Sequence, residues 1–431
     1  MQNNVIYRKH SARANQLSGI TKYTLVVLIL FVHEVNWAAK VTFEMHELPE
    51  LLSLRGHDVD FLDFPEGVRR FGIRRLVDFR TEIVTHSSRT FDGSRVRVIT
   101  PGRIFIPPID RFVASLSFIP CLIALMKAKR YDMIILYAVP TNGWQTILLA
   151  RLFDTPVLYR GLDVSHEIRR SRFRRLIRVA ERFVYRNATW LSLNNRELLD
   201  YCVDMGARRD LCSVDFAGVG GNWSTSKSKA LKLRAQLSIA AEKRVVYYLG
   251  SLFTFCGLPR VLDELAHNTQ LRESISLVIT GDGELTDELS KMVKELNLQD
   301  CVRLVGRIGF DQIPLYLEMA DIGIIPFDQG LVSHAAFPWK AVQYLVASLP
   351  VVASPLKGLQ SVFPEEVGVV YSTPQRSLLK RVEELLFDPK MSNSIAQRGR
   401  DFVEENFMWE DNIIKFEDRF QSVIELNLLN Q

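Results

Sequence analysis

Gly281-Asp-Gly-Glu284 and Phe337-Pro-Trp-Lys-Ala-Val-Gln-Tyr344 are the two segments that decide the fold predicted for this chain. Both lie within a run of alternating apolar strands and amphipathic helices. The expected strands are VVYYLG, SLVIT, VRLVG, DIGIIPF and LPVVAS. This alternation predicts a parallel sheet covered by helices. Where such a strand ends in a glycine-rich turn before a helix, backbone N–H groups and the helix dipole favour the binding of a nucleotide or phosphate.

The first half of the chain shows the same alternation. Its expected strands are TLVVLIL, DVDFLDF, VRVIT, MIILYAV, PVLYR and TWLSLN. A helix between the first two contains Pro49, which predicts a kink or a break near Leu48. The polar segment 220–229 is the expected linker. A chain of 431 residues suits two domains, and we place them at 23–220 and 221–405, with an extension at 1–22 and a terminal helix at 406–431.

Composition narrows the class of protein. Hydrophobic residues make up 47% and charged residues 24% of the chain, which is typical of a globular protein. The five cysteines are scattered without CxxC spacing, which argues against a disulfide framework or zinc site and favours a reducing cytoplasm. The apolar segment 23–33 is about ten residues long, whereas a spanning helix needs about 20. We therefore expect a buried first strand there, rather than a signal peptide or anchor.

Positive charge is concentrated in the first half of the chain. Residues 1–215 hold 32 Lys and Arg against 22 Asp and Glu, whereas the remainder holds 22 against 27. The arginines gather in two clusters: Arg69, Arg70, Arg74, Arg75 and Arg80, and then Arg169, Arg170, Arg172, Arg174, Arg175, Arg178, Arg182 and Arg186. Because apolar residues alternate with the second cluster, it predicts either a helix on an anionic membrane surface or a solvated helix that packs on its own domain. No nucleic-acid-binding module accompanies the charge.

Taken together, these segments resemble family 4 glycosyltransferases of the GT-B fold. The strongest resemblance lies in YLGSL, GLPRVLDEL, VITGDGEL, VRLVGRIGFDQIPLYLEMADIGIIPF, FPWKAVQYLVASLPVVASPLKGL and RGRDFVEENFMWEDN. Weaker similarity continues upstream through LLSLRGHDVDFLDF, RYDMIILYAVPTNGWQTILLARLFDTPVLYR and ERFVYRNATWLSLNNRELLDYCVDMGA. The resemblance implies an α/β fold with two Rossmann-like domains facing a cleft and a C-terminal helix crossing back to the first domain.

The resemblance also implies an activity. It predicts transfer of a sugar from a nucleotide diphosphate donor to a glycan or lipid-linked acceptor, in the synthesis of cell-surface polysaccharide or glycolipid. Retention of configuration, no metal or other cofactor, and no nucleic acid partner are expected. The protein would be cytoplasmic or peripheral on the inner face of the membrane. Two rival hypotheses remain open: a catalytically degenerate relative that serves as a binding or scaffold subunit, and an epimerase, which would need a pair of carboxylates that we do not identify.

The same resemblance exposes departures at the phosphate site. Relatives hold the diphosphate with an Arg and a Lys in the turn after the first strand of the second domain, and these positions are Ser251 and Cys256 here. Three alternatives remain open: another cation binds the diphosphate, the helix dipole alone stabilises it, or the enzyme is impaired. The replacement candidates are Arg160, Arg260 and Lys357. We expect Cys256 to be a packing residue.

The resemblance carries over to the following site residues. The catalytic candidates are Arg160, Asp163 and His166. The expected donor-binding residues are Gly250, Ser251, Gly281, Asp282, Gly283, Arg307, Ala335, Phe337, Lys340 and Gln343. Ala335 and Gln343 stand where the family has two Glu, and Gln343 retains an oxygen acceptor. Lys340 either reaches a phosphate or is solvated.

Several polar residues follow the strands of the first half. Thr141 and Asn142 follow MIILYAV, and Asn36 and Trp37 follow TLVVLIL, so all four are expected at the sheet edge where ligands bind. Asp58-Val-Asp60 matches a DxD metal-binding motif, but its alternation with apolar residues predicts a strand instead.

Overall fold

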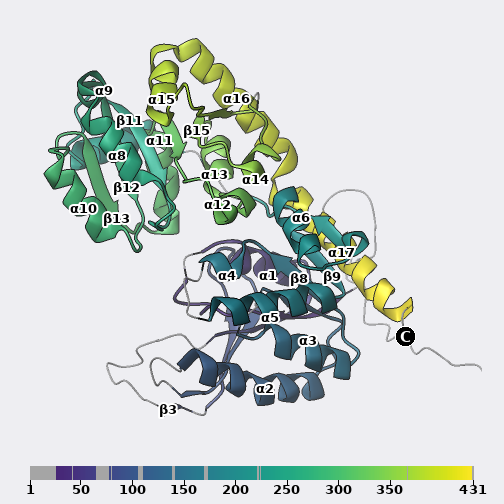
Figure 1. Ribbon diagram of the computed structural model, residues 1–431. Helices are drawn as coiled ribbons and strands as arrows, with labels where there is room; N and C mark the ends of the chain where they lie inside the picture. The colour runs from purple at the N-terminus through teal and green to yellow at the C-terminus, as the bar shows by residue number, and fades with distance from the viewer. Residues whose placement is uncertain are drawn as a thin grey trace, which may run out of the picture. The chain divides into compact units, whose positions relative to one another are not determined.

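The computed structural model describes residues 26–40, 42–64, 77–78, 80–104, 110–137, 141–168, 173–220, 223, 225–365 and 367–429. These residues fall into two compact α/β units (Figure 1). The first unit comprises Met1–Tyr159 and Phe420–Gln431, and the second comprises Arg160–Arg419. The domain limits expected at residues 220 and 405 stay predictions.

The first unit is built on a mainly parallel sheet. Its strands are β1 Leu28–Val32, β2 Asp58–Leu62, β4 Glu82–Ser87, β5 Val96–Thr100, β7 Met133–Leu136 and β8 Val157–Gly161, the last of which extends into the second unit. They run in the order β8-β7-β1-β2-β5-β4, with only β4 antiparallel to its neighbour. The unit also contains a short antiparallel pair, β3 Val77–Asp78 and β6 Arg103–Ile104. Its helices are α1 Glu44–Leu54, α2 Asp110–Ala128 and α3 Gly143–Leu152.

The expected strands of the first half are all present among the described residues. β1 lies within TLVVLILFV, and its last four residues are buried, so the expectation of a buried strand is confirmed for this part of the segment. The expected break at Pro49 is wrong, because α1 runs through this residue. Proline removes one backbone donor, and burial of the apolar face formed by Met45, Leu48 and Leu52 maintains the helix. No helix in the described ranges has both the length and the apolar character needed to cross a membrane.

Asp58 and Asp60 lie on β2, as the alternating pattern predicts. Asp60 is fully buried, and its carboxylate pairs with Arg97 and with Lys129, whose Nζ lies 3.2 Å from Oδ2. Tyr131 donates a hydrogen bond to the same carboxylate over 2.6 Å. Burial alone would raise the pKa of Asp60, but the hydrogen bonds from Arg97 and Tyr131 and the charge of Lys129 hold it below its usual value. This carboxylate therefore joins β2 to Arg97 on β5 and to the segment that precedes β7.

The second unit begins with a parallel strand pair and the helices around it. The strands are β9 Trp190–Leu193 and β10 Cys212–Val214, and the helices are α4 Ser165–Ile168, α5 Arg174–Asn187 and α6 Arg196–Asp204, followed by a 3₁₀ turn at Arg209–Leu211. In α5, Ile177, Glu181, Val184 and Tyr185 are buried. The rest of α5 carries exposed arginines together with exposed Leu176 and Val179, and Phe173, directly before the helix, is also exposed. Arg169, Arg170, Arg172 and most of the first basic cluster lie outside the described residues.

A six-stranded parallel sheet forms the rest of the second unit. Its strands are β11 Arg244–Leu249, β12 Ile275–Thr280, β13 Val302–Gly306, β14 Ile322–Ile325, β15 Val351–Ala353 and β16 Val369–Tyr371. The helices are α7 Lys227–Gln236, α8 Leu258–Ala266, α9 Thr269–Ser274, α10 Thr286–Glu295, α11 Ile313–Met319, α12 Leu331–Ala335, α13 Lys340–Val346, α14 Lys357–Gln360, α15 Leu378–Phe387, α16 Pro389–Asn406 and α17 Trp409–Leu429, with a 3₁₀ turn at Phe310–Gln312. The residues of α17 from Phe420 onward belong to the first unit. The five strands expected from the sequence are confirmed, and β16 is an addition that the sequence analysis missed.

The strand order of this sheet is β13-β12-β11-β14-β15-β16. The chain builds outward from β11 through β12 to β13, and then returns to place β14 on the other side of β11. The loops after β11 and β14 therefore diverge at the carboxyl edge of the sheet, and such a switch point is where α/β sheets bind ligands. All six residues of β12 are buried, as expected for a strand with both faces covered.

Candidate functional site

The glycine-rich turn at the switch point is packed too closely for side chains. Gly281 has φ +134°, and a Cβ atom there would lie 1.9 Å from the carbonyl oxygen of Gly250. Gly283 has φ +158°, and its Cβ would lie 2.7 Å from the carbonyl oxygen of Leu252. Backbone hydrogen bonds join the two loops: Leu252 N donates to the carbonyl of Asp282 over 2.9 Å, and Leu285 N donates to that of Leu252 over 3.0 Å. The GDGE turn and the loop after β11 thus form one rigid backbone surface.

Lys340 reaches this surface from the first residue of α13. Its Nζ lies 3.9 Å from the centroid of the Tyr248 ring and 4.8 Å from that of Phe327. A Cβ on Gly250 would lie only 3.0 Å from the same nitrogen. Burial lowers the pKa of Lys340 to about 7, partly offset by the nearby Cys256. The ammonium group is therefore held between β11 and the loop after β14, at the switch point.

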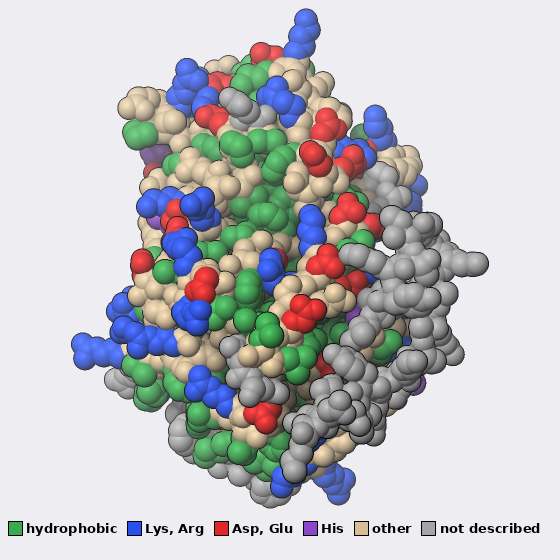
Figure 2. Space-filling view, turned by 90° about the vertical axis from the view of Figure 1, so that its right-hand side faces the viewer, with side chains coloured by type: hydrophobic (Ala, Val, Ile, Leu, Met, Phe, Trp, Pro, Cys, Tyr) green, Lys and Arg blue, Asp and Glu red, His purple; other side chains and the backbone are tan. Residues whose placement is uncertain are grey.

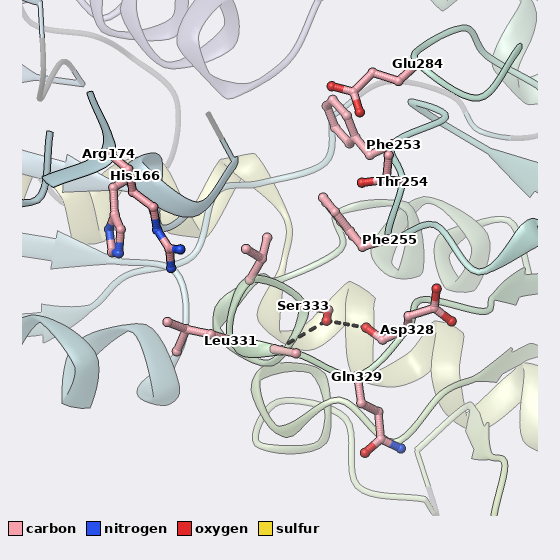
Figure 3. Close-up of a pocket in the computed structure, with 12 residues that line it drawn as sticks. His166, Arg174, Phe253, Thr254, Phe255, Glu284, Asp328, Gln329, Leu331 and Ser333 are labelled. Carbon is pink, nitrogen blue, oxygen red and sulfur yellow. Dashed lines mark hydrogen bonds between the residues drawn. The ribbon is translucent and has the colours of Figure 1, made fainter. Parts of the chain in front are cut away.

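A pocket of about 450 Å³ opens beside these loops (Figure 3). Every residue that lines it belongs to the second unit. They come from four segments and are His166 and Arg174, Phe253–Phe255, Glu284, and Asp328–Ser333. Figure 3 shows His166 and Arg174 in one part of the lining, with Phe253 and Glu284 on two other segments. The Ser333 hydroxyl donates to the carbonyl oxygens of Asp328 and Gly330, which fixes the loop that ends at α12.

His166 is held by a buried carboxylate. Its Nδ1 lies 2.6 Å from Oε2 of Glu181, and its backbone N–H donates to Oε1 over 2.9 Å. Tyr201 also donates its hydroxyl hydrogen to Oε2, over 3.2 Å. Glu181 is fully buried and His166 nearly so. A carboxylate on Nδ1 fixes the orientation and tautomer of an imidazole, so His166 presents a defined ring to the pocket.

The other two catalytic candidates do not line this pocket. Arg160 is 1% exposed, and its guanidinium donates to the Asp215 carbonyl over 2.8 Å and the Ser192 hydroxyl over 3.2 Å. It also lies 5.3 Å above the centroid of the Phe416 ring. These contacts explain why an arginine is buried here without reference to a ligand. Asp163 lies between β8 and α4 and is partly exposed. Catalytic roles for both stay predictions.

The expected donor-binding residues separate into two groups. Gly250, Gly281, Gly283 and Lys340 meet at the switch point, as described above. Ser251 is exposed, and its carbonyl accepts a hydrogen bond from the Tyr248 hydroxyl over 2.9 Å. Asp282 and Arg307 form a long exposed ion pair, with 4.0 Å between Oδ1 and Nε, at the end of β12 and β13.

The remaining predicted donor residues are held by packing. The carbonyl of Ala335 accepts a hydrogen bond from Asn195 over 2.8 Å. Phe337 stacks on Phe363 and Phe407 with ring centroids 6.0 Å apart in each case. Gln343 is buried within α13. Among these three, the side chain of Phe337 has a clear structural use in the core.

The polar residues expected at the edge of the first sheet are hydrogen-bonded to other residues of the first unit. Asn142 donates to the His33 carbonyl over 3.1 Å, and the backbone N–H of Thr141 donates to Glu34 over 3.3 Å. Asn36 donates to Asp63 over 2.8 Å. These bonds position the loops after β1 and β7. In the described part of the chain, no group of three or more His, Cys, Asp and Glu side chains is arranged to hold a metal ion.

Sequence reasoning missed several pocket residues. Phe253 and Phe255 stack with ring centroids 5.4 Å apart, and their aromatic alternation in SLFTF was a signal that we did not use. Glu284 is the last residue of the GDGE motif, and the sequence analysis assigned no role to it. Nothing in the sequence indicated that Glu181 contacts the site, because this residue lies in an arginine-rich helix and its partner His166 is 15 residues away.

Models of two protein families match this chain. The model of group 1 glycosyl transferases matches residues 230–402, and the model of a glycosyl transferase 4-like domain matches residues 43–214. Among curated proteins, the chain is 27% identical over 202 residues to the lipopolysaccharide 1,2-N-acetylglucosaminetransferase of Salmonella typhimurium. That match covers 44% of this chain and 51% of the relative. The chain thus spans about half the length of the curated relatives it matches.

Solved structures match over almost the whole chain. Sucrose-phosphate synthase from Thermosynechococcus elongatus superposes with a TM-score of 0.74 at 18% identity, covering 93% of this chain and 99% of that one. The Anabaena protein HepE in complex with UDP-glucose gives a TM-score of 0.68 at 17% identity, covering 93% and 99%. At this level of identity the likeness concerns the fold, and it confirms the GT-B class expected from the sequence. Since the two family models together span most of the chain, it belongs to the group 1 family of glycosyltransferases with the GT-B fold.

Proposed function

We propose that this protein transfers a sugar from a nucleotide diphosphate donor to a glycan or lipid-linked acceptor, with retention of anomeric configuration. The observation that carries the proposal is the backbone surface of Gly250, Gly281 and Gly283, which lies beside Lys340 and the 450 Å³ pocket. Pockets of this size accommodate small molecules. A close approach of ligand phosphate to backbone requires glycine, and the three residues provide it at the switch point.

The arrangement suggests how the reaction proceeds. The donor diphosphate would lie against the glycine surface, and the sugar would enter the pocket. As the bond from C1 to the diphosphate breaks, charge develops on the leaving phosphate and must be stabilised by a nearby positive group. The acceptor hydroxyl oxygen then bonds to C1 on the face that the phosphate leaves, and its proton passes to a phosphate oxygen. We propose that this reaction needs neither metal nor covalent cofactor, so transfer should persist in EDTA.

UDP-sugars are the first donors to test. The Anabaena protein of similar fold was crystallised with UDP-glucose. A curated relative of similar sequence is a GDP-mannose-dependent mannosyltransferase from Mycobacterium tuberculosis. UDP-glucose and GDP-mannose differ in base and sugar, so a panel with both bases is required.

The acceptor side of the proposal rests on α5. Arg175, Arg178 and Arg182 are exposed on this helix, beside the exposed apolar residues Leu176 and Val179. On the face drawn in Figure 2, Lys and Arg side chains lie among exposed hydrophobic ones. Arginines attract anionic lipids and apolar side chains insert among them. We therefore propose a lipid-linked acceptor and a peripheral position on the cytoplasmic face of a membrane.

A second candidate is a degenerate relative that binds a partner or a glycan without catalysis. It is favoured by Ser251 and Cys256, where relatives carry cations. Cys256 is buried, and burial raises the pKa of its thiol, which fits a packing role. Incubation of the purified chain with nucleotide sugars and acidic vesicles distinguishes the two functions. Release of nucleoside diphosphate supports the enzyme, whereas binding without release supports the degenerate relative.

A further inference from the structure

The loop that follows β11 carries no cation of its own. From Ser251 to Cys256 it reads Ser-Leu-Phe-Thr-Phe-Cys. A diphosphate placed on the glycine surface would carry two or more negative charges into a partly enclosed site, where unpaired charge is costly. A positive side chain must therefore reach the surface from another element.

The cations suggested by the sequence are bonded to other groups or exposed to solvent. Arg160 donates to Asp215 and Ser192 and is almost fully buried. Arg260 donates to the Pro326 carbonyl over 3.0 Å and pairs with Asp328 at 3.4 Å. Lys357 is exposed at the start of α14.

Lys340 differs from these three. Within the described residues, no carboxylate lies within ion-pair distance of its ammonium group, whose recorded neighbours are the Tyr248 and Phe327 rings. Rings stabilise a cation but leave its N–H donors without acceptors. The ammonium is also the nearest atom to the vacant Cβ position of Gly250, at 3.0 Å. Because Gly250 lacks a side chain, Lys340 extends to the backbone surface on which we place the diphosphate.

We propose that Lys340 binds the donor diphosphate and replaces the cations that Ser251 and Cys256 do not provide. This inference rests on the proposed function, and it assigns the charge that the function requires to a residue on α13. Gly250 leaves room for the ammonium, Tyr248 and Phe327 hold it, and the phosphate supplies the missing acceptor. The side chain should contribute to binding of a nucleoside diphosphate and little to binding of the nucleoside alone.

Protonation of Lys340 should make the binding depend on pH. Burial lowers the pKa of the free side chain to about 7. The groups that face it are the Cys256 thiol from the turn before α8 and the two aromatic rings. Asp328, from the loop after β14, acts on the Cys256 thiol. Above pH 7 the free protein loses the ammonium charge, so binding of a diphosphate must include uptake of a proton. Affinity should then fall by up to about tenfold per pH unit.

The experiment is calorimetric titration of the full chain with UDP, GDP, ADP and the three nucleosides. Lys340→Met should weaken binding of the preferred diphosphate by about 10- to 100-fold, the range for a hydrogen bond to a charged group, and leave nucleoside binding unchanged. Lys340→Arg should retain the affinity and abolish its fall between pH 7.5 and 8.5. Lys357→Met is the matched control and should bind like wild type.

The outcomes separate the two proposals. Wild-type protein that binds none of the diphosphates would overturn the proposed function itself. Wild-type protein that binds, together with unchanged affinity in Lys340→Met, would overturn the role of Lys340 and leave the proposed function standing. If Lys340→Met does not fold, the comparison of wild type with Lys340→Arg decides. Equal pH dependence in both would then contradict the inference, since arginine stays charged throughout this range.

Discussion

The imidazole Nδ1 of His166 lies 2.6 Å from the Oε2 atom of Glu181, a carboxylate that is fully buried beneath the pocket. A buried carboxylate on one ring nitrogen leaves the other nitrogen in a fixed direction and tautomer. Because His166 lines the pocket, this pair resembles the base and orienting group of many active sites. We therefore expect Glu181 to position His166, whose catalytic role stays a prediction.

Replacing Glu181 with Gln should lower kcat for sugar transfer by about tenfold or more, because the His166 imidazole would lose the orientation and tautomer that the carboxylate fixes. The dissociation constant of the donor should change little. Steady-state kinetics and calorimetry check the two quantities separately. In a His166→Ala variant, Glu181→Gln should not lower kcat further, because the effects of substituting residues that act as a unit are not additive. Additive losses would show that Glu181 does not act through His166.

Gly281 should tolerate no side chain. Gly281→Ala would place Cβ 1.9 Å from the Gly250 carbonyl oxygen at a φ of +134°. We expect a loss of about 2 kcal/mol or more in unfolding free energy, together with loss of donor binding. Urea unfolding and calorimetric titration measure these effects.

Gly306→Ala is the matched control for this change. Gly306 also has a positive φ, +80°, but no atom lies within 4 Å of its Cβ position. Only the backbone strain remains there, so we expect Gly306→Ala to lower the free energy of unfolding by about 1 kcal/mol. Equal losses in the two variants would show that the close contact between the two loops contributes nothing.

The parts of the fold that the sequence predicted were those with strong local patterns. The buried apolar runs that became β11, β12 and β14 are continuous because the sheet is covered on both faces. β4 could not be found in this way, since it pairs at the edge and five of its six residues are exposed. β16 was missed although its buried apolar run, Val369–Tyr371, is as long as β15, so its length does not explain the omission.

The candidate site was less predictable. The glycines at 250, 281 and 283 predict a tight turn, because glycine readily adopts the positive φ values that such turns require. The pairing of His166 with Glu181 joins residues from different helices, and the position of Lys340 depends on the packing of α13 against the end of β11. Arg160 was predicted from the resemblance and its charge, but it lies within β8, all five residues of which are buried. Contacts between separate elements therefore decide which cation reaches the site.

Asp60 should stabilise the first unit at neutral pH. Asp60→Asn leaves Arg97 and Lys129 without their buried counter-charge, so we expect the free energy of unfolding to fall by about 3 kcal/mol. The exposed neighbour Asp58, whose Oδ2 lies 3.3 Å from Lys129 Nζ, is the control. Asp58→Asn should cost less than about 1 kcal/mol.

The contribution of Asp60 to the free energy of unfolding should also depend on pH in a defined direction. Because the pKa of Asp60 is lower in the folded protein, the stabilisation is complete above the ordinary carboxyl pKa of about 4 and is lost as pH falls through the folded value. The difference between wild type and Asp60→Asn in urea unfolding should therefore shrink from pH 5 towards pH 3. A difference that stays constant would mean that the charge of Asp60 is unimportant.

Reversing three exposed arginines of α5, Arg175, Arg178 and Arg182, to Glu should release the protein from vesicles that contain phosphatidylglycerol. Raising salt should do the same, because exposed charges are screened over about 10 Å at 0.1 M. Vesicle co-sedimentation measures both effects. The matched control reverses Lys227, Lys229 and Lys232, which are exposed on α7. Release by the control as well would indicate a general effect of net charge and not a membrane-binding face.

The most direct test of the central claim is the response of the full chain to a panel of nucleotide sugars that includes UDP-glucose and GDP-mannose. A ligand that binds only the folded state stabilises it by about 2.7 kcal/mol at 100 times its dissociation constant. We predict that at least one nucleotide sugar raises the melting temperature, and that the same donor is cleaved to nucleoside diphosphate when acidic vesicles are present. A chain that is stabilised by none of them and cleaves none would contradict the assignment as a sugar transferase.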